Sequence, residues 1–514
     1  MRLLLALIFF AGRSWCADAT ILDLTHQSRV FHETRHYRIF LPSGYDATQT
    51  RYPVIYWFHG HSERYNQGPP GKPYDRGADY HGDNIARFVS GHDVIVVKLD
   101  GYNPRTPNED YPRPYNIGPV ETDRQFPLYF PEFVAFIDAT YRTIPNREHR
   151  ATAGLSMGGF MSFWIAGKYP DLVSSASNFM GSSEFVVGPR EFPTEYRHDE
   201  MYANYAGVRT RLVTGAHDFI QFYHRQMNLI WTPMLPTHET EDFDSEHGTP
   251  GMAKTLEFHM KAFASPLPRP ETWSHADVYP NFTVWDWTIE TDRRQPGFTS
   301  LTNVSRRGFR SVVREWLPGG KILGGVKLKI TTARLYRPNA RIKVGAQVLT
   351  TDHEGRLHLE LAGGENEVGI GAEAPRPPQL DSTRIFAVAT NFQIADHRAF
   401  TVYQHAIEKQ SLTLGQGNGD GLANPGEEIA ILFQDGDAYR AAELFSGDLC
   451  ADLTHRVSDY WGDYDWVGAS AKYTLLKISP DCPAGHIINL RTRFLIPNKP
   501  NHQIRDANIE LKIQ

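Results

Sequence analysis

A serine among glycines, in the run G-L-S-M-G-G at residues 154–159, constrains the fold of this chain more than any other feature. The preceding residues, 150–153, are typical of a buried strand, and the following residues, 160–166, are typical of a helix. A serine at so sharp a strand-to-helix turn favours glycine two positions before and after it, as here. We predict that the turn holds the Ser156 hydroxyl at the edge of a sheet, ahead of a helix N-terminus that favours negative charge. A glycine-rich turn with an incidental serine is the alternative.

Residues 20–264 alternate between strand and helix patterns, which predicts a doubly wound, mostly parallel α/β sheet. The expected strands cover 37–41, 54–58, 94–97, 150–153, 174–179, 211–214 and 237–243. The expected helices cover 84–88, 130–141, 160–166, 222–231 and 250–263. Long loops rich in glycine and proline, 66–82 and 101–119, follow strand ends, where such folds build their sites.

The composition changes after a proline-rich linker at residues 265–272. Short alternating runs and frequent turns then predict a sandwich-like all-β accessory domain over 273–374. The run 282–289 alternates throughout and is interpreted as one strand. A second proline-rich break precedes another β-rich accessory domain at 380–514.

The first residues, 1–19, resemble a secretory signal peptide, because Arg2 precedes a short apolar run and then small residues. This predicts a secreted or periplasmic protein, against the alternative of a first buried strand or helix. Removal of the segment would leave two cysteines, Cys450 and Cys482, as a disulfide or as two unpaired buried thiols. No later apolar run is long enough to span a membrane, and a net charge of −6 argues against nucleic acid as a partner.

A serine nucleophile needs a base, and the base needs an orienting acid. In folds with this elbow, the chain order is serine, acid, histidine. Asp218 follows the strand at 211–214 and fits the acid, although it could instead cap the next helix. His247 lies between the last strand and the last helix and fits the base.

Other residues compete for these roles. Asp242 and Asp244 are weaker candidates for the acid because they lie on or beside the last strand. His224 and His259 lie within expected helices and point less naturally at a shared site.

The oxyanion of an acyl-transfer reaction needs backbone N–H donors. The loop after the strand at 54–58 begins His59-Gly60, and such a loop supplies one donor while the residue after the nucleophile supplies the other. We assign these donors to the backbone of His61 and Met157. The mechanism needs no cofactor and no metal.

The combination of His59-Gly60, G-L-S-M-G-G, Asp218 and His247-Gly248 resembles the esterase D-like α/β-hydrolases over residues 20–264. Within them, the chain is most similar to the secreted feruloyl and acetyl-xylan esterases of carbohydrate esterase family 1. The resemblance implies a serine esterase that hydrolyses feruloyl or acetyl esters on plant-wall polysaccharides or oligosaccharides. The chain departs from the family at 61–65, where H-S-E-R-Y replaces a glycine-rich run.

Two other function classes remain open from the sequence. One is a carbohydrate-binding or adhesion protein with a degenerate hydrolase domain, which the large accessory half favours. The other is an acyltransferase or a peptidase on the same fold, because water and other acceptors use the same catalytic groups.

The accessory half contains two further candidate ligand sites. Oxygen ligands for Ca²⁺ could come from Asn418, Asp420 and Glu427 or Glu428, although a turn between strands explains the same residues. Aromatic side chains could contact glycans, or could fill a sandwich core instead; the candidates are Trp285, Trp287, Trp461 and Trp466. Trp285 and Trp287 are expected on one face of a single strand.

Overall fold

The computed structural model describes residues 18–61, 63–66, 81–102, 114–198, 201–315, 317 and 321–371, and parts of the chain beyond residue 402. Those later parts are 403–407, 410–414, 423–432, 434–435, 438–439, 441–455, 457–458, 473–495 and 504–514. The signal-like segment up to residue 17 and the second proline-rich break lie outside the described residues, as do Asn418, Asp420, Trp461 and Trp466.

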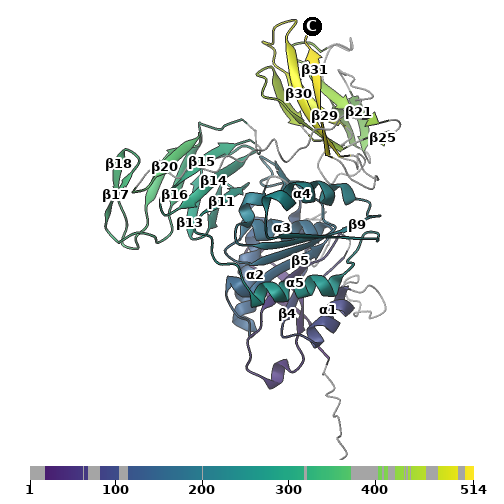
Figure 1. The fold of residues 1–514 in the computed structure, drawn as a ribbon, viewed down its shortest axis with the longest axis vertical. Coiled ribbons are helices and arrows are strands. Elements are labelled where there is room, and N and C mark those ends of the chain that lie inside the picture. Colours follow the sequence, from purple (N-terminus) through teal and green to yellow (C-terminus); the bar gives the residue numbers. More distant parts are fainter. Residues whose placement is uncertain are drawn as a thin grey trace, which may run out of the picture.

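An eight-stranded sheet forms the first unit, with the strand order β1-β2-β4-β3-β5-β6-β9-β10 (Figure 1). Its strands are β1 (Thr20–Gln27), β2 (Thr34–Leu41), β3 (Val54–Phe58), β4 (Ile95–Leu99), β5 (Arg150–Leu155), β6 (Ser175–Phe179), β9 (Arg209–Gly215) and β10 (His238–Phe243). β1 pairs antiparallel with β2, and β2 pairs antiparallel with β4. The other six strands of the sheet, β4, β3, β5, β6, β9 and β10, run parallel to one another. Every residue of β3 and β4 is buried, as expected of strands covered on both faces.

Helices cover both faces of this sheet (Figure 1). The helices are α1 (His81–Ser90), α2 (Phe126–Thr140), α3 (Met157–Lys168), α4 (Gln221–Met234) and α5 (Met252–Ala264). Side chains of α2, α3 and α4 share one apolar core with the sheet, and those of α1 and α5 share another. The predicted α/β-hydrolase architecture is confirmed.

Several shorter elements complete this unit. They are the 3-10 turns Tyr45–Ala47, Pro114–Asn116, Thr122–Arg124, Arg147–His149 and Tyr202–Tyr205, and the hairpin of β7 (Glu184–Val187) and β8 (Thr194–Arg197). α2 begins four residues earlier than the apolar pattern indicated, because Pro127 is accepted in the first turn of a helix.

Two four-stranded antiparallel sheets, β11-β14-β15-β20 and β12-β13-β16-β19, follow and share an apolar core. Their strands are β11 (Trp273–Asp277), β12 (Asn281–Val284), β13 (Trp287–Thr291), β14 (Phe298–Ser305), β15 (Gly308–Arg314), β16 (Lys327–Thr331), β19 (His358–Ala362) and β20 (Asn366–Gly369). A separate hairpin joins β17 (Arg341–Val344) and β18 (Gln347–Thr350).

The interpretation of 282–289 as one strand is wrong. β12 and β13 form a hairpin in which Val284 pairs with Trp287. The two residues between them, Trp285 and Asp286, have φ of 51° and 66°, as a tight two-residue turn requires. The two tryptophans therefore do not share a strand face.

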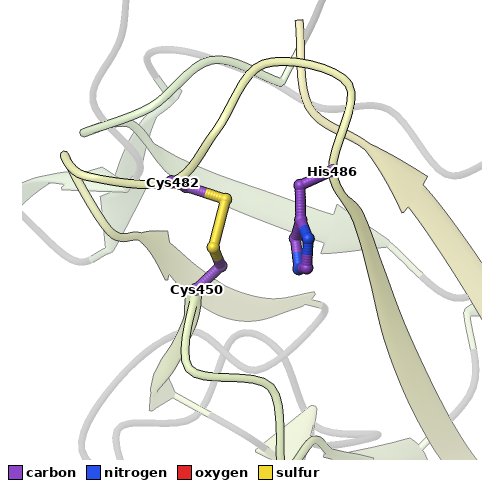
Figure 2. Close-up of side chains that lie close together, drawn as sticks. All are labelled: Cys450, Cys482 and His486. Carbon is purple, nitrogen blue, oxygen red and sulfur yellow. A yellow bond between two sulfur atoms is a disulfide. The ribbon is translucent and has the colours of Figure 1, made fainter.

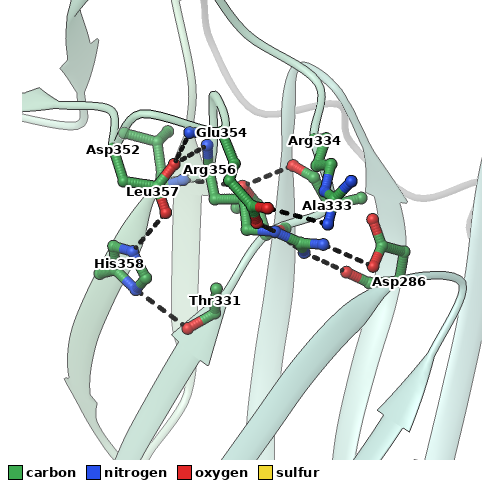
Figure 3. A network of polar contacts seen from close by, with 10 residues as sticks. Asp286, Thr331, Ala333, Arg334, Asp352, Glu354, Arg356, Leu357 and His358 are labelled. Atoms are coloured by element: carbon green, nitrogen blue, oxygen red, sulfur yellow. Dashed lines mark hydrogen bonds and ion pairs between the residues drawn. The ribbon is translucent and has the colours of Figure 1, made fainter. Parts of the chain in front are cut away.

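Arg356 links that hairpin turn to the turn at residues 352–356 (Figure 3). Its guanidinium donates to the backbone and side-chain oxygens of Asp286, at 2.9 and 2.7 Å, and also contacts Glu354. Asp352 accepts from the backbone N–H of Arg356 and contacts His358, and these hydrogen bonds lower the pKa of Asp352 to about 2. The turn residues of this sandwich are thus held by charge-assisted hydrogen bonds.

The described C-terminal segments form two antiparallel sheets, β23-β29-β27 and β28-β26-β30-β31, and two hairpins. Their strands are β21 (Tyr403–Ile407), β22 (Gln410–Leu414), β23 (Glu428–Leu432), β24 (Gln434–Asp435), β25 (Ala438–Tyr439), β26 (Ala441–Phe445), β27 (Ala451–His455), β28 (Val457–Ser458), β29 (Tyr473–Ile478), β30 (Ile487–Leu495) and β31 (Ile504–Lys512). Additional antiparallel sheets thus follow the α/β unit, as predicted.

Candidate active site

Ser156 occupies a strained turn between β5 and α3. Its φ of 58° and ψ of −121° are unusual for a residue with a side chain. A Cβ on Gly154 or on Gly158 would collide with the backbone of the facing strand and turn, so both positions require glycine. The Ser156 N–H donates to the Phe179 carbonyl at 2.8 Å, which anchors the turn to β6. The predicted strand–turn–helix elbow is present.

Neighbouring strand ends bring the other candidates to the same edge of the sheet. β5, β6, β9 and β10 are adjacent and parallel, so the residues after their carboxyl ends lie together. Met180 follows β6 and accepts from the backbone N–H of Gly248 on its sulfur, at 3.2 Å. This contact ties the loop that carries His247 to the strand end beside Ser156.

His247 pairs with Asp218. The Nδ1 atom of His247 lies 3.0 Å from both carboxylate oxygens of Asp218. Asp218 is buried, and its Oδ1 also accepts from the backbone N–H of Ile220 at 2.9 Å. With Nδ1 donating to this carboxylate, Nε2 is the nitrogen of His247 that remains for proton transfer.

A second histidine lies against the same carboxylate. His224 Nε2, on α4, is 3.5 Å from Asp218 Oδ2, and both side chains are fully buried. Burial opposes ionisation of Asp218, but the hydrogen bond from His247 and the nearby His224 outweigh it and lower the pKa of the carboxyl. From the sequence, His224 is expected to point less naturally at the site, because it lies within a helix. The structure places it against the carboxylate of Asp218.

Ser156 and His247 are not joined by a hydrogen bond in the described part of the chain. Ser156 is 6% exposed, and the imidazole of His247 is 19% exposed. The structure therefore shows the contact between His247 and Asp218, and it places Ser156 in the strained elbow at the same edge of the sheet.

Charged side chains hold the loop after β3 in place. They belong to the run 61–65, where this chain lacks the glycine-rich run of the esterases that it resembles. Glu63 Oε2 accepts from the backbone N–H of Gly60 at 2.9 Å. The next residue, Arg64, makes two hydrogen bonds to the buried carboxylate of Asp100, which follows β4. A Cβ on Gly60 would lie 3.5 Å from Ser156 Cβ and 3.6 Å from Glu63 Oε2, so this loop packs directly beside Ser156.

The predicted oxyanion donors belong to two segments, the start of α3 and the loop after β3. Met157 is the first residue of α3, where a backbone N–H has no acceptor within its own helix. His61 is an exposed residue of the loop that follows β3. His59 is structural, since its Nε2 accepts from the Gly101 N–H at 2.9 Å and Tyr115 donates to its carbonyl.

The competing candidates have other partners. Asp242 accepts from the hydroxyl of Thr214, and Asp244 is exposed and lies 2.6 Å from His217. His259 is buried between the hydroxyls of Ser175 and Ser177, at 2.9 and 2.8 Å. These contacts leave Asp218 as the acid that meets His247.

The candidate ligand sites of the accessory half are occupied by structural contacts where the chain is described. Trp285 and Trp287 are buried, with 4% and 1% exposure, so they do not offer faces to a glycan. Glu427 is buried and accepts from the backbone N–H of Asn424.

A group of possible metal ligands, Cys450, Cys482 and His486, lies together in the C-terminal unit (Figure 2). The two sulfurs are bonded to each other in a disulfide, and His486 Nε2 is 2.9 Å from the carboxylate of Asp448. Bonded sulfurs are not thiolates, so this donor set does not fit a metal ion.

Residues 28–248 match the model of a protein family described as "Putative esterase". Two curated esterases of Mycobacterium tuberculosis, MT1326 and Rv1288, are each 30% identical over 145 residues. The match covers 28% of this chain and 28% of each relative, so the chain spans little more than a quarter of their length.

Solved structures of hydrolases align with about half of the chain. A ferulic acid esterase aligns with a TM-score of 0.38 and 20% identity, and covers 48% of this chain and 98% of that chain. A ferulic acid esterase from Anaeromyces mucronatus, in complex with ferulic acid, has a TM-score of 0.37, 16% identity and coverage of 48% and 92%. An S-formylglutathione hydrolase from Staphylococcus aureus has a TM-score of 0.37, 13% identity and coverage of 48% and 100%.

The resemblance to esterases that the motifs predicted is confirmed by the family model, which residues 28–248 of this chain match.

Proposed function

We propose that this chain is a serine carboxylic-ester hydrolase in which Ser156 is the nucleophile, His247 the general base and Asp218 the orienting acid. The observation that carries the proposal is the hydrogen-bonded pair of His247 and buried Asp218 at the sheet edge where Ser156 occupies its strained elbow. The match of residues 28–248 to the esterase family supports it.

In the acylation step, His247 Nε2 takes the proton from Ser156 Oγ as that oxygen bonds to the ester carbonyl carbon. The carbonyl oxygen gains a negative charge, which the backbone N–H groups of Met157 and His61 would stabilise. The imidazolium is stabilised by Asp218 and gives its proton to the leaving alcohol oxygen as the carbon–oxygen bond breaks. An acyl-enzyme and a free alcohol result.

In the deacylation step, a water molecule loses a proton to His247 Nε2 and attacks the acyl carbon. The proton then returns to Ser156 Oγ as the acid leaves, which restores the enzyme. The lowered pKa of Asp218 keeps the carboxylate ionised in both steps, so that Nδ1 of His247 stays fixed as a donor.

The substrates we propose are feruloyl or acetyl esters on plant-wall polysaccharides or oligosaccharides. The support is the motif set around Ser156, which resembles esterases of that class. We also propose export to the periplasm or the medium, on the pattern of residues 1–19. Among the described residues, none of the helices has both the length and the apolar character that crossing a membrane would require.

The test is hydrolysis of a panel of acetyl, feruloyl and longer acyl esters of simple alcohols and saccharides by the purified full chain. Ser156→Ala should lower kcat at least about a thousandfold. Ser162→Ala, on the helix α3 that follows Ser156, is the matched control and should retain activity. Equal turnover by wild type and Ser156→Ala would refute the mechanism.

The same assay separates the other function classes. Binding to xylan with no turnover of any ester would indicate a binding protein, and transfer of the acyl group to an added alcohol in preference to water would indicate an acyltransferase.

A further inference from the structure

Phe219 is an exposed aromatic side chain beside the proposed catalytic base. It is 46% exposed, and in the described part of the α/β unit the other exposed large apolar side chain is Leu22, on the edge strand β1. The ring of Phe219 lies 4.5 Å from the ring of His247, with an angle of 44° between the planes. What distinguishes Phe219 is its place, because the ring lies against the proposed catalytic base while most aromatic side chains of this unit are buried.

The backbone around Phe219 is held on both sides. Asp218 precedes it and accepts from the N–H of Ile220, which follows it, so the two neighbours close a tight turn across Phe219. Asp218 and Ile220 are buried, with 1% and 5% exposure. The turn therefore directs the neighbouring side chains inward and leaves the Phe219 ring beside His247.

The position of the Phe219 ring beside His247 bears on how the alcohol part of the ester would bind. Because His247 donates to Asp218 through Nδ1, its Nε2 passes the proton to the oxygen of the leaving alcohol. In the acylation step the alcohol must therefore lie within hydrogen-bond distance of the His247 ring. An alcohol bound at Nε2 and large enough to extend over the imidazole would meet the Phe219 ring, which contacts the same imidazole.

We propose that Phe219 is a specificity-determining residue that binds the alcohol part of the ester, and that this alcohol is a sugar ring. A pyranose presents a face of C–H groups that packs on an aromatic ring, whereas a short alkyl alcohol does not reach it. The proposal rests on the proposed esterase function and adds to it where the sugar binds. It also provides an aromatic glycan contact in place of Trp285 and Trp287, which are buried.

The test keeps the acyl group constant and varies the alcohol. Wild type, Phe219→Ala and Phe219→Trp are compared on ethyl acetate and on an acetylated methyl xylopyranoside. In Phe219→Ala, kcat/KM for the sugar ester should fall about five- to tenfold while the value for ethyl acetate changes less than about twofold. Phe219→Trp should keep the preference for the sugar ester, because it restores an aromatic face.

Two results would overturn the inference. An equal loss on both esters, with a shifted pH profile of kcat, would show that the ring acts through His247. An unchanged kcat/KM on both esters would show that the ring does not contact the alcohol.

Different results would refute the proposed esterase function itself. These are retained turnover in Ser156→Ala, or a wild type that hydrolyses no ester at all. A wild type that hydrolyses ethyl acetate in a Ser156-dependent manner but not the sugar ester would retain the esterase function and refute the sugar site.

Discussion

Lys168 Nζ, at the end of the helix that follows Ser156, lies 2.6 Å from Asp277 Oδ2 on β11, and each side chain is 4% exposed. The ammonium also lies 4.2 Å from the centre of the Tyr279 ring. Val278, Tyr279 and Phe298 belong to the same apolar core as α2 and α3. The first β unit therefore packs directly on the α/β unit and takes part in burying the charged end of α3.

Removal of one partner of this ion pair should destabilise the protein strongly. Asp277→Ala leaves the Lys168 charge buried and unpaired, and we expect the loss of about 3–5 kcal/mol of unfolding free energy. The surface pair Lys254–Glu241 gives the matched control, because Lys254 is 65% exposed and Lys254→Ala should cost less than about 1 kcal/mol. Chemical denaturation of the full-length variants measures both, and equal effects would contradict this account.

Acid should destabilise the α/β unit through its buried histidines. Burial lowers the pKa of His259 to about 3, against about 6.5 in an unfolded chain. The unfolded state then binds the proton more readily, so this contribution is complete above about pH 6.5 and is lost as the pH falls toward 3. At pH 5 the loss is about 2 kcal/mol for such a histidine.

The measurement is the slope of unfolding free energy against pH between 7 and 5. His259→Gln should flatten the slope whatever it does to stability at pH 7. A His259→Gln slope as steep as that of wild type would contradict the prediction.

Glu63 should matter through its hydrogen bond to Gly60. Glu63→Ala removes the acceptor of the Gly60 N–H and frees the loop beside Ser156, so kcat should fall about tenfold. Glu63→Gln keeps a side-chain oxygen at the same position and removes the negative charge near the oxyanion, so kcat should stay at or above the wild-type value. Steady-state kinetics on one ester decide the matter, and similar kcat values for the two variants would refute a positioning role.

His224 should help to keep the pKa of Asp218 low. His224→Ala removes a positive influence on Asp218, so the pKa of Asp218 should rise, and an NMR titration of its carboxyl carbon measures the change. Loss of the packed imidazole should also lower kcat about ten- to a hundredfold, less than the roughly ten-thousandfold expected for Asp218→Asn. His224→Asn, closer in size, should give a smaller fall. A pKa of Asp218 identical to that of wild type would show that His224 only fills space.

The elbow at Ser156 could be predicted because its glycines stand at fixed offsets from the serine. The structure adds the physical cause, since a Cβ at residue 154 or 158 would collide with the backbone of Phe58, at the end of β3. Asp218 and His247 could be placed because parallel strands bring their carboxyl ends to one edge, so chain order sufficed.

Other features depend on contacts between distant parts of the chain, which the sequence does not reveal. The pattern at 282–289 appeared continuous because a two-residue turn preserves alternation, and Trp285-Asp286 lacks the glycine or asparagine that usually marks such a turn. The role of His224 depends on which side of α4 faces the carboxylate, and that is set by the packing of α4 on the sheet. The pairing of Lys168 with Asp277 joins residues more than a hundred positions apart.

The central claim is that Ser156 is the nucleophile, and covalent labelling tests it most directly. The full chain is treated with a fluorophosphonate, which forms an oxygen–phosphorus bond with an activated serine and releases fluoride. Mass spectrometry of the digested protein then locates the adduct. This account predicts one adduct per chain, on Ser156, and none in Ser156→Ala. An adduct on another serine, or equal labelling of Ser156→Ala, would contradict it.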